Sequence, residues 1–353
     1  MKKSLIALAV AGAFAAPVAM AETTIYGAAN VSFDIVNSGS GGASANQVSS
    51  NASAVGFKGS EDLGGGTSAI WQIETGVSLD KGGDAWAGNT AFAGLSGADW
   101  GSVVLGRLNA PYKVATRGLD LFADTIADNR SLIGAGTQDY ANDTIGYTSP
   151  AMSGVTIAAA IMAGAESPFS GATKGTGYSL AAMYGAAPIN ATFAYQSATF
   201  GSAGTGNLGA GSGINKDDKM TAWTLGGGYT MDAIQMNAQY ERQSFKPNSG
   251  SSVDQSNWYL AGKYNMGGDA VKLAYTRAGD YSGTSDTGAS QISLGYDHSM
   301  TKNTMVYALY TQISNKKFAG NGMGGYDVIT ANVGAAMNDS DPSVWSLGMK
   351  HSF

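Results

Sequence analysis

The most constraining feature of this chain is a two-residue alternation of apolar and polar side chains over segments of about ten residues. In the last segment, Trp345, Leu347, Met349 and Phe353 fall on one face, and small or polar residues occupy most positions of the other. Strands of soluble proteins usually have five or six residues, roughly half this length. The second faces carry no apolar set that could fill a soluble core. Long strands of this kind are typical of an all-β barrel that spans a membrane, where closure pairs every backbone group.

The connections between these segments alternate in length. Short turns are expected at Leu63–Gly66, Ala98–Gly101, Ser149–Gly154, Ala187–Asn190, Met231–Ile234, Met266–Asp269 and Ser299–Asn303. Long connections include Ile35–Ser50, Ala110–Asp139, Gly201–Lys216 and Lys316–Asp341. Seven short turns and eight long loops join sixteen antiparallel strands, with the short turns facing the periplasm. Aromatic residues near strand ends are expected at the membrane interfaces, namely Tyr229, Tyr240, Tyr264, Tyr275, Tyr296 and Tyr307.

Residues 1–21 have the pattern of a secretory signal peptide. Lys2 and Lys3 precede an apolar stretch, and Ala19-Met20-Ala21 forms a small-residue cleavage site. The mature chain is then a single barrel domain, residues 22–353. The full chain has a net charge of −6, and loss of the two lysines makes the mature chain −8.

Composition excludes several classes of function. The chain has no cysteine and only two histidines, His298 and His351, so neither thiol chemistry nor a His-rich metal site is expected. The negative net charge disfavours nucleic acid as a partner. The motif Gly204-x-Gly206-x-x-Gly209 lies in a Gly/Ser-rich segment with no helix after it, which indicates an external loop. We expect no cofactor, no metal and no catalysis.

The long connection after Arg107 contains one segment with helical spacing, residues 118–134. Asp120, Asp124 and Asp128 fall on one face of such a helix, and Leu119, Phe122 and Ile126 fall on the opposite face. A solvated surface helix has the same pattern. The alternative is a third loop folded into the barrel, with its apolar face on the wall and its carboxylates lining the lumen.

Strand alternation assigns several charged side chains to the barrel interior. Lys58 and Glu74 alternate with outward apolar residues, and Lys263, Lys272 and Asp297 also fall on polar faces. An acidic loop that faces a basic wall would create a transverse field across a narrow water channel. Charged rings of this kind set ion preference.

The order and spacing of several segments resemble those of Gram-negative general-diffusion porins, particularly the betaproteobacterial branch. The resemblance covers essentially the whole chain and rests on TTIYGAANVSFD (23–34), GFKGSEDLGGG (56–66), AIWQIETG (69–76), LGRLNAPYK (105–113), IGYTSPAMSGVTIAAA (145–160) and the terminal MKHSF. It implies a homotrimer of sixteen-stranded barrels in the outer membrane, among lipid and lipopolysaccharide. It also implies a third loop that constricts each pore, passage of small hydrophilic solutes, and recognition of Phe353 by the barrel-assembly machinery.

The resemblance further implies which charges line the constriction. Arg107 matches an arginine of the family's fifth strand, whereas Ala54 and Gly146 stand where two other arginines are usual. The expected basic side is Arg107, Lys58 and Lys263, and the expected acidic side is Asp120, Asp124, Asp128 and Glu74. Loss of two arginines, together with the net charge of the mature chain, favours cations.

Four functions are compatible with these observations. A passive channel is the leading one, and a substrate-specific outer-membrane channel with a saturable binding site is the nearest alternative. An outer-membrane enzyme would need His298 or His351 beside a nucleophile, although both lie on apolar faces. A soluble exported β protein such as an adhesin would not fractionate with outer membranes.

Overall fold

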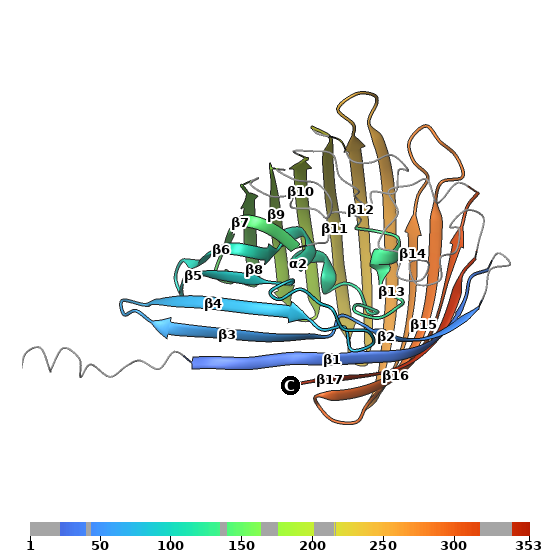
Figure 1. Cartoon of the computed structure of the whole chain (residues 1–353), viewed down its shortest axis with the longest axis horizontal. Helices are drawn as coiled ribbons and strands as arrows, with labels where there is room; N and C mark the ends of the chain where they lie inside the picture. Colours follow the sequence, from blue (N-terminus) through green and yellow to red (C-terminus); the bar gives the residue numbers. More distant parts are fainter. Residues whose placement is uncertain are drawn as a thin grey trace, which may run out of the picture.

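The barrel wall is one antiparallel sheet that closes on itself (Figure 1). The computed structural model describes residues 22–39, 44–134, 140–163, 176–200, 215, 217–317 and 341–353. The signal-peptide segment 1–21 and the motif at 204–209 lie outside these ranges. From β3 (Ala54–Asp62) to β17 (Ser343–Ser352) each strand pairs with the next, and β1 (Glu22–Asn37) pairs with β17 to close the ring.

The remaining strands follow the same order along the chain and around the barrel. They are β2 (Ala45–Ser50), β4 (Thr67–Gly76), β5 (Ala91–Gly97), β6 (Gly101–Asn109), β7 (Tyr140–Thr148), β8 (Val155–Met162), β9 (Thr176–Ala186), β10 (Ile189–Thr199), β11 (Lys219–Met231), β12 (Ile234–Lys246), β13 (Val253–Met266), β14 (Asp269–Ala278), β15 (Ala289–Ser299) and β16 (Thr304–Asn315). The described helical elements are α2 (Pro111–Arg117) and η1 (Asn129–Ser131).

The seventeen labelled strands make sixteen barrel strands, as the sequence predicts. Both β2 and β3 pair with β1, the former along Val31–Val36 and the latter along Glu22–Ala28. Between them Ala52 adopts a left-handed φ of 53°, which breaks the hydrogen-bond ladder and shifts its register by one residue. β2 and β3 are therefore two pieces of one strand.

Alternation of side chains along the strands agrees with the sequence pattern. In β17, Trp345 and Leu347 are 62% and 64% exposed, whereas Val344, which precedes them, and Ser346, which lies between them, are buried. The apolar set therefore faces outward, where lipid covers it, and the polar set faces the lumen. The seven short turns also lie where the sequence places them. None of the described helices is both long and apolar enough to cross a bilayer.

One of the six tyrosines that the sequence assigns to the membrane interfaces, Tyr307, lies elsewhere in the structure. Tyr229, Tyr264, Tyr275 and Tyr296 are exposed on the outer surface, as expected for an interfacial belt. Tyr307 instead faces inward, is buried, and donates a hydrogen bond to Asn30 Oδ1 at 3.1 Å. The prediction for Tyr307 is wrong because its position has inward parity, which proximity to a strand end does not reveal.

The third loop enters the barrel, but its helix differs from the one predicted. The helix α2 begins at Pro111 and ends at Arg117. Proline suits this first position because a backbone N–H there would have no acceptor within the helix. Residues 118–128 form turns instead of the predicted helix. Asp120 accepts a hydrogen bond from Phe122 N at 2.9 Å, and Asp128 accepts one from Arg130 N at 2.9 Å. Such bonds from aspartate side chains to nearby backbone N–H groups compete with the backbone hydrogen bonds of a helix. The spacing of the aspartates therefore belongs to a series of turns.

Candidate functional site: the lumen and its third loop

The first half of the third loop lies on the inner wall of β8 to β13. The helix α2 packs against β8, β9 and β10. Tyr112 N donates to Ser179 Oγ at 2.9 Å, and Asn237 Nδ2 of β12 donates to Leu119 O at 2.7 Å. Leu121 N then donates to the Tyr259 hydroxyl of β13 at 2.9 Å. The loop is thus tied to successive strands through backbone groups.

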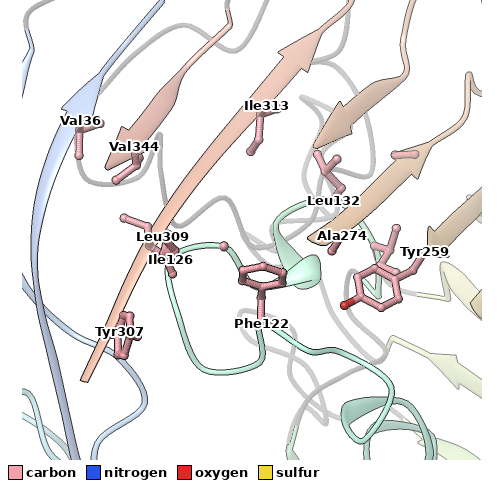
Figure 2. Close-up of a cluster of buried hydrophobic side chains, with 13 residues drawn as sticks. Val36, Phe122, Ile126, Leu132, Tyr259, Ala274, Tyr307, Leu309, Ile313 and Val344 are labelled. Carbon is pink, nitrogen blue, oxygen red and sulfur yellow. The ribbon is translucent and has the colours of Figure 1, made fainter. Parts of the chain in front are cut away.

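The middle of the loop packs its apolar side chains on the adjoining stretch of wall, from β13 to β17. Figure 2 shows Phe122 and Ile126 on the loop beside the strand that carries Leu309. Phe122 also lies over β15, where a Cβ added at Gly295 would be only 2.8 Å from the Phe122 ring. The glycine therefore permits this close approach. The predicted apolar face of Leu119, Phe122 and Ile126 is buried against the wall.

The three loop aspartates surround Arg117. The guanidinium contacts Asp124 at 2.9 Å and Asp128 at 2.8 Å, and it lies 3.9 Å from Asp120. Arg130 also contacts Asp128 at 3.1 Å. Asp120 and Asp128 are buried, and only the Asp124 side chain is substantially exposed, at 39%. The structure therefore brings the three predicted acidic residues together around a loop arginine, and Asp128 binds a second one.

The environment of this cluster separates the proton affinities of its members. Burial, followed by repulsion from the Asp128 carboxylate, raises the pKa of Asp120 to about 6. Burial acts in the same direction on Asp128, but Arg117 and Arg130 outweigh it and hold the pKa of Asp128 below its usual range. Burial acts to lower the pKa of Arg117, and the three carboxylates outweigh it and raise the pKa.

Glu241 of β12 accepts hydrogen bonds from both described ends of the third loop. The sequence pattern did not predict this role. The Tyr112 hydroxyl donates to Glu241 Oε2 at 2.8 Å, and Gly134 N donates to Oε1 at 2.9 Å. Gln243 and Asn257 donate to Oε1 at 2.8 and 2.9 Å. Glu241 is completely buried. In the sequence, the only available signal was an inward-facing glutamate between two outward-facing positions.

The inner wall of β1, β3 and β4 carries two of the other predicted charges. Glu74 accepts hydrogen bonds from the Tyr26 hydroxyl at 2.8 Å and from Asn89 Nδ2 at 3.0 Å. Lys58 is exposed, and its Nζ lies 5.1 Å from the centroid of the Tyr26 ring. The structure therefore brings Lys58 and Glu74 together around one tyrosine on β1, β3 and β4.

Arg107 contacts the same stretch of wall from β6. Its Nε donates to the carbonyl oxygens of Gly88 and Asn89 at 2.9 and 3.0 Å, and Nη1 donates to Asn142 Oδ1. A register shift between Gly106 and Leu108 lies beside it, and such irregularities re-aim side chains. Arg107 is partly exposed, and its bond to Asn89 places it next to the group around Glu74.

Further inward charges lie on β13 to β17. Lys272 and Asp297 form a buried ion pair at 3.0 Å, so they neutralise each other. Lys350 Nζ lies 4.0 Å from Asp124 at the loop, and both are partly exposed. Lys263 is partly exposed and has inward parity beside Lys272. Lys263 is thus on the inner wall as predicted, but on a different stretch from Lys58 and Arg107.

Phe353 lies at the seam where the barrel closes. Its backbone exchanges hydrogen bonds with Gly27 in both directions at 3.0 Å, and its side chain is 56% exposed. Gly27 leaves room for the ring, since an added Cβ would lie 2.6 Å from Phe353 Cζ. The terminal aromatic is therefore accessible at the outer surface of the closing strands.

The described residues include both histidines of the chain and most of its acidic side chains. They contain no group of three or more His, Asp or Glu side chains arranged to hold a metal ion. His298 contacts Asp269 at 2.7 Å and His351 contacts Thr304 at 2.9 Å, and both histidines are exposed on the outer surface.

Comparison with known proteins agrees with this architecture. Residues 7–317 match the family model of the Gram-negative porins. Outer membrane porin protein 32 of Delftia acidovorans is 28% identical over 372 residues, covering all of both chains. The major outer membrane protein P.IB of Neisseria meningitidis serogroup B is 41% identical over 121 residues, covering 32% of this chain and 35% of that protein.

Solved structures of porins share the fold. An anion-selective porin from Comamonas acidovorans superposes with a TM-score of 0.76 at 22% identity, covering 94% of this chain and 100% of that one. The trimer form of OmpT of Vibrio cholerae gives a TM-score of 0.69 at 12% identity, covering 94% and 99%. The family match, the closed barrel and the outward apolar faces agree. This chain therefore belongs to the Gram-negative porins of the outer membrane.

Proposed function

We propose that this porin is a passive, water-filled channel for small hydrophilic solutes, narrowed by its third loop and biased toward anions. The observation that carries the proposal is the asymmetry of the loop, which packs on the wall from β8 to β17. Inner side chains of β3 to β6, which we call the uncovered wall, stay exposed or partly exposed, as at Lys58 and Glu74. The lumen then runs between the loop and the uncovered wall.

The anion bias follows from which inward charges remain accessible. Asp120 and Asp128 are buried beside arginines, and Lys272 is paired with Asp297. The exposed or partly exposed charges that we place on the lumen include basic Lys58, Arg107, Arg130, Lys263 and Lys350, and acidic Asp62, Glu74 and Asp124. This balance is opposite to the one inferred from the net charge of −8 and the missing arginines, because pairing removes two loop carboxylates.

Two properties of similar porins support the proposal. The structurally similar Comamonas acidovorans porin is described as anion-selective, and the Vibrio cholerae OmpT is described in a trimer form. We propose that this chain is likewise a homotrimer. We also propose that Phe353, accessible at the barrel seam, is the residue that the barrel-assembly machinery reads.

Solute flux separates the passive channel from a substrate-specific one. Liposomes containing the purified protein should swell in neutral sugars at rates that fall with sugar size and rise linearly with concentration. A rate that saturates for one solute and is competitively blocked by its analogues would instead establish a binding site within the same barrel.

A further inference from the structure

Asp34, on the inner face of β1, is a buried carboxylate with very little to compensate its charge. The residue is completely buried, and the Ser49 hydroxyl of β2 donates a hydrogen bond to Asp34 Oδ2 at 2.5 Å. The other oxygen, Asp34 Oδ1, is buried and has no hydrogen-bond partner among the described residues. Burial of a carboxylate in this state is costly, because neither water nor a positive charge stabilises it.

The other buried carboxylates of the described ranges are better compensated. Each of them contacts a basic side chain or accepts hydrogen bonds from at least two donors. They are Asp120, Asp128, Asp218, Glu241 and Asp297. Glu241 has four donors, for example, and Asp297 has the Lys272 ammonium at 3.0 Å. Asp34 has a single hydroxyl donor and no ion pair within the described part of the chain.

Side chains that carry oxygen flank Asp34 on both sides across the sheet. Its paired residues are Ser346 of β17 and Gln47 of β2. The Ser346 hydroxyl is buried and, like Asp34 Oδ1, lacks a hydrogen-bond partner among the described residues. Gln47 Nε2 donates to Ser49 Oγ at 3.2 Å, so the amide nitrogen is engaged and the amide oxygen remains. Three adjacent strands thus place hydroxyl and amide oxygens beside one buried carboxylate.

The spacing of Asp34 and Ser346 suits an ion that bridges them. Side chains at directly paired positions of an antiparallel sheet have Cβ atoms about 5 Å apart. Two oxygens that bind one hard cation, each at about 2.4 Å, are themselves about 3–5 Å apart. Most of this range exceeds the length of a hydrogen bond. Asp34 Oδ1 and Ser346 Oγ are neighbours that do not bond to each other, as this arrangement requires.

We propose that Asp34 binds a monovalent alkali cation, with Ser49, Ser346 and Gln47 supplying further oxygens. A donor set of oxygens without nitrogen or sulfur suits hard cations. The charge of the site then selects among them. One positive charge neutralises one carboxylate surrounded by neutral hydroxyl and amide groups, whereas a divalent ion would leave an excess of buried positive charge. A site with a single carboxylate differs from the clusters of acidic side chains that hold divalent metals.

The proposed site lies where the barrel closes. Strand β1 pairs with β17 on one side of Asp34 and with β2 on the other. The next inward pair along β1 and β17 is Val36 with Val344, and both belong to the apolar cluster that holds Ile126 of the third loop (Figure 2). A cation held by Asp34 and Ser346 therefore stabilises the closing contact of the barrel, and its loss favours separation of β1 from β17.

Thermal unfolding in different salts tests the proposal. The half-time of unfolding of the purified protein in detergent is measured at one elevated temperature and pH 7.5, in sodium, potassium or choline chloride. Choline is too large for the site, and equal ionic strength keeps screening constant. We expect unfolding at least about threefold slower in sodium or potassium chloride than in choline chloride. Asp34→Asn should unfold at one rate in all three salts, whereas Asp232→Asn, in the exposed turn between β11 and β12, should keep the wild-type dependence.

Three results would overturn the proposal: equal wild-type rates in the three salts, the same salt dependence in Asp34→Asn, or protection by calcium chloride alone. If Asp34→Asn does not fold, Ser346→Ala, which removes one oxygen, should need a severalfold higher sodium concentration for the same protection, and an unchanged requirement contradicts the site. Crystals soaked in thallium(I) acetate locate the ion directly. We expect an anomalous peak beside Asp34, and occupied peaks elsewhere without one there would contradict the proposal.

Discussion

The Tyr112 hydroxyl donates a hydrogen bond to Glu241 Oε2 at 2.8 Å, joining the helix at the start of the third loop to the middle of the barrel wall. Gly134 at the end of the loop donates to the other oxygen of the same carboxylate. Some twenty residues of loop therefore begin and end at one buried side chain. This arrangement limits how far the loop can move without exposing a charge and its donors.

Substitution of Glu241 should loosen the loop. Glu241→Ala leaves four donors without their acceptor, at a cost of about 1–3 kcal/mol for each buried group that water does not reach. We expect noisier single-channel currents and closure at lower voltage. Tyr112→Phe removes one of these bonds and should give a weaker version of the same change. Quiet, wild-type currents from a correctly folded Glu241→Ala channel would contradict this role.

Ion preference should depend on pH through Asp120. Because burial and Asp128 raise the pKa of Asp120 to about 6, the folded protein binds a proton there between the ordinary carboxyl pKa and about 6. The folded loop is therefore stabilised as pH falls through this window, and its net charge becomes less negative. Reversal potentials measured from pH 7.5 to pH 5 should shift toward anions.

Asp120→Asn is the matched control for that titration. It removes the titrating group and keeps an oxygen that can accept from Phe122 N. Its reversal potential at pH 7.5 should resemble that of the wild type at pH 5 and should change little with pH. An equal pH shift in both proteins would assign the titration to another group.

Charges on the uncovered wall should control the sign of selectivity. Lys58→Glu replaces an exposed inward cation beside Glu74, and we expect a shift toward cations of at least about twofold in the permeability ratio. Ala54→Arg adds an inward cation on the same strand and should shift the ratio toward anions. Gly146→Arg needs Leu108 to move, since an added Cβ would lie 2.7 Å from its Cδ1. Lys302→Glu, in the short turn between β15 and β16, should leave the ratio unchanged.

Phe353 should matter for assembly more than for the finished barrel. Its backbone bonds to Gly27 remain available to any residue, whereas its exposed ring is removed in Phe353→Ala. We expect a severalfold lower yield of folded protein in outer membranes, with normal conductance for protein refolded in detergent. Equal defects in cells and after refolding would indicate a structural role at the seam instead.

The sequence was sufficient to predict the wall because inward and outward positions alternate along most of each strand. Trp345 and Val344 differ as the pattern requires, and the short turns are at the expected positions. The loop was predicted less well. Its aspartates have helical spacing, but Asp120 and Asp128 accept backbone hydrogen bonds that form turns. The pairing of Asp128 with Arg117, and the contact of Tyr112 with Glu241, join residues whose proximity no local pattern encodes.

The most direct test of the account is the reversal potential of the purified protein in a planar bilayer under a potassium chloride gradient at pH 7.5. We predict stepwise, ohmic conductance in groups of three and a reversal potential of the sign expected for chloride preference. Two results from correctly folded protein would contradict this prediction: no ion conductance, or a reversal potential of the sign expected for potassium preference. Either would mean that the basic side chains of the uncovered wall, together with loop aspartates paired to loop arginines, do not set the selectivity.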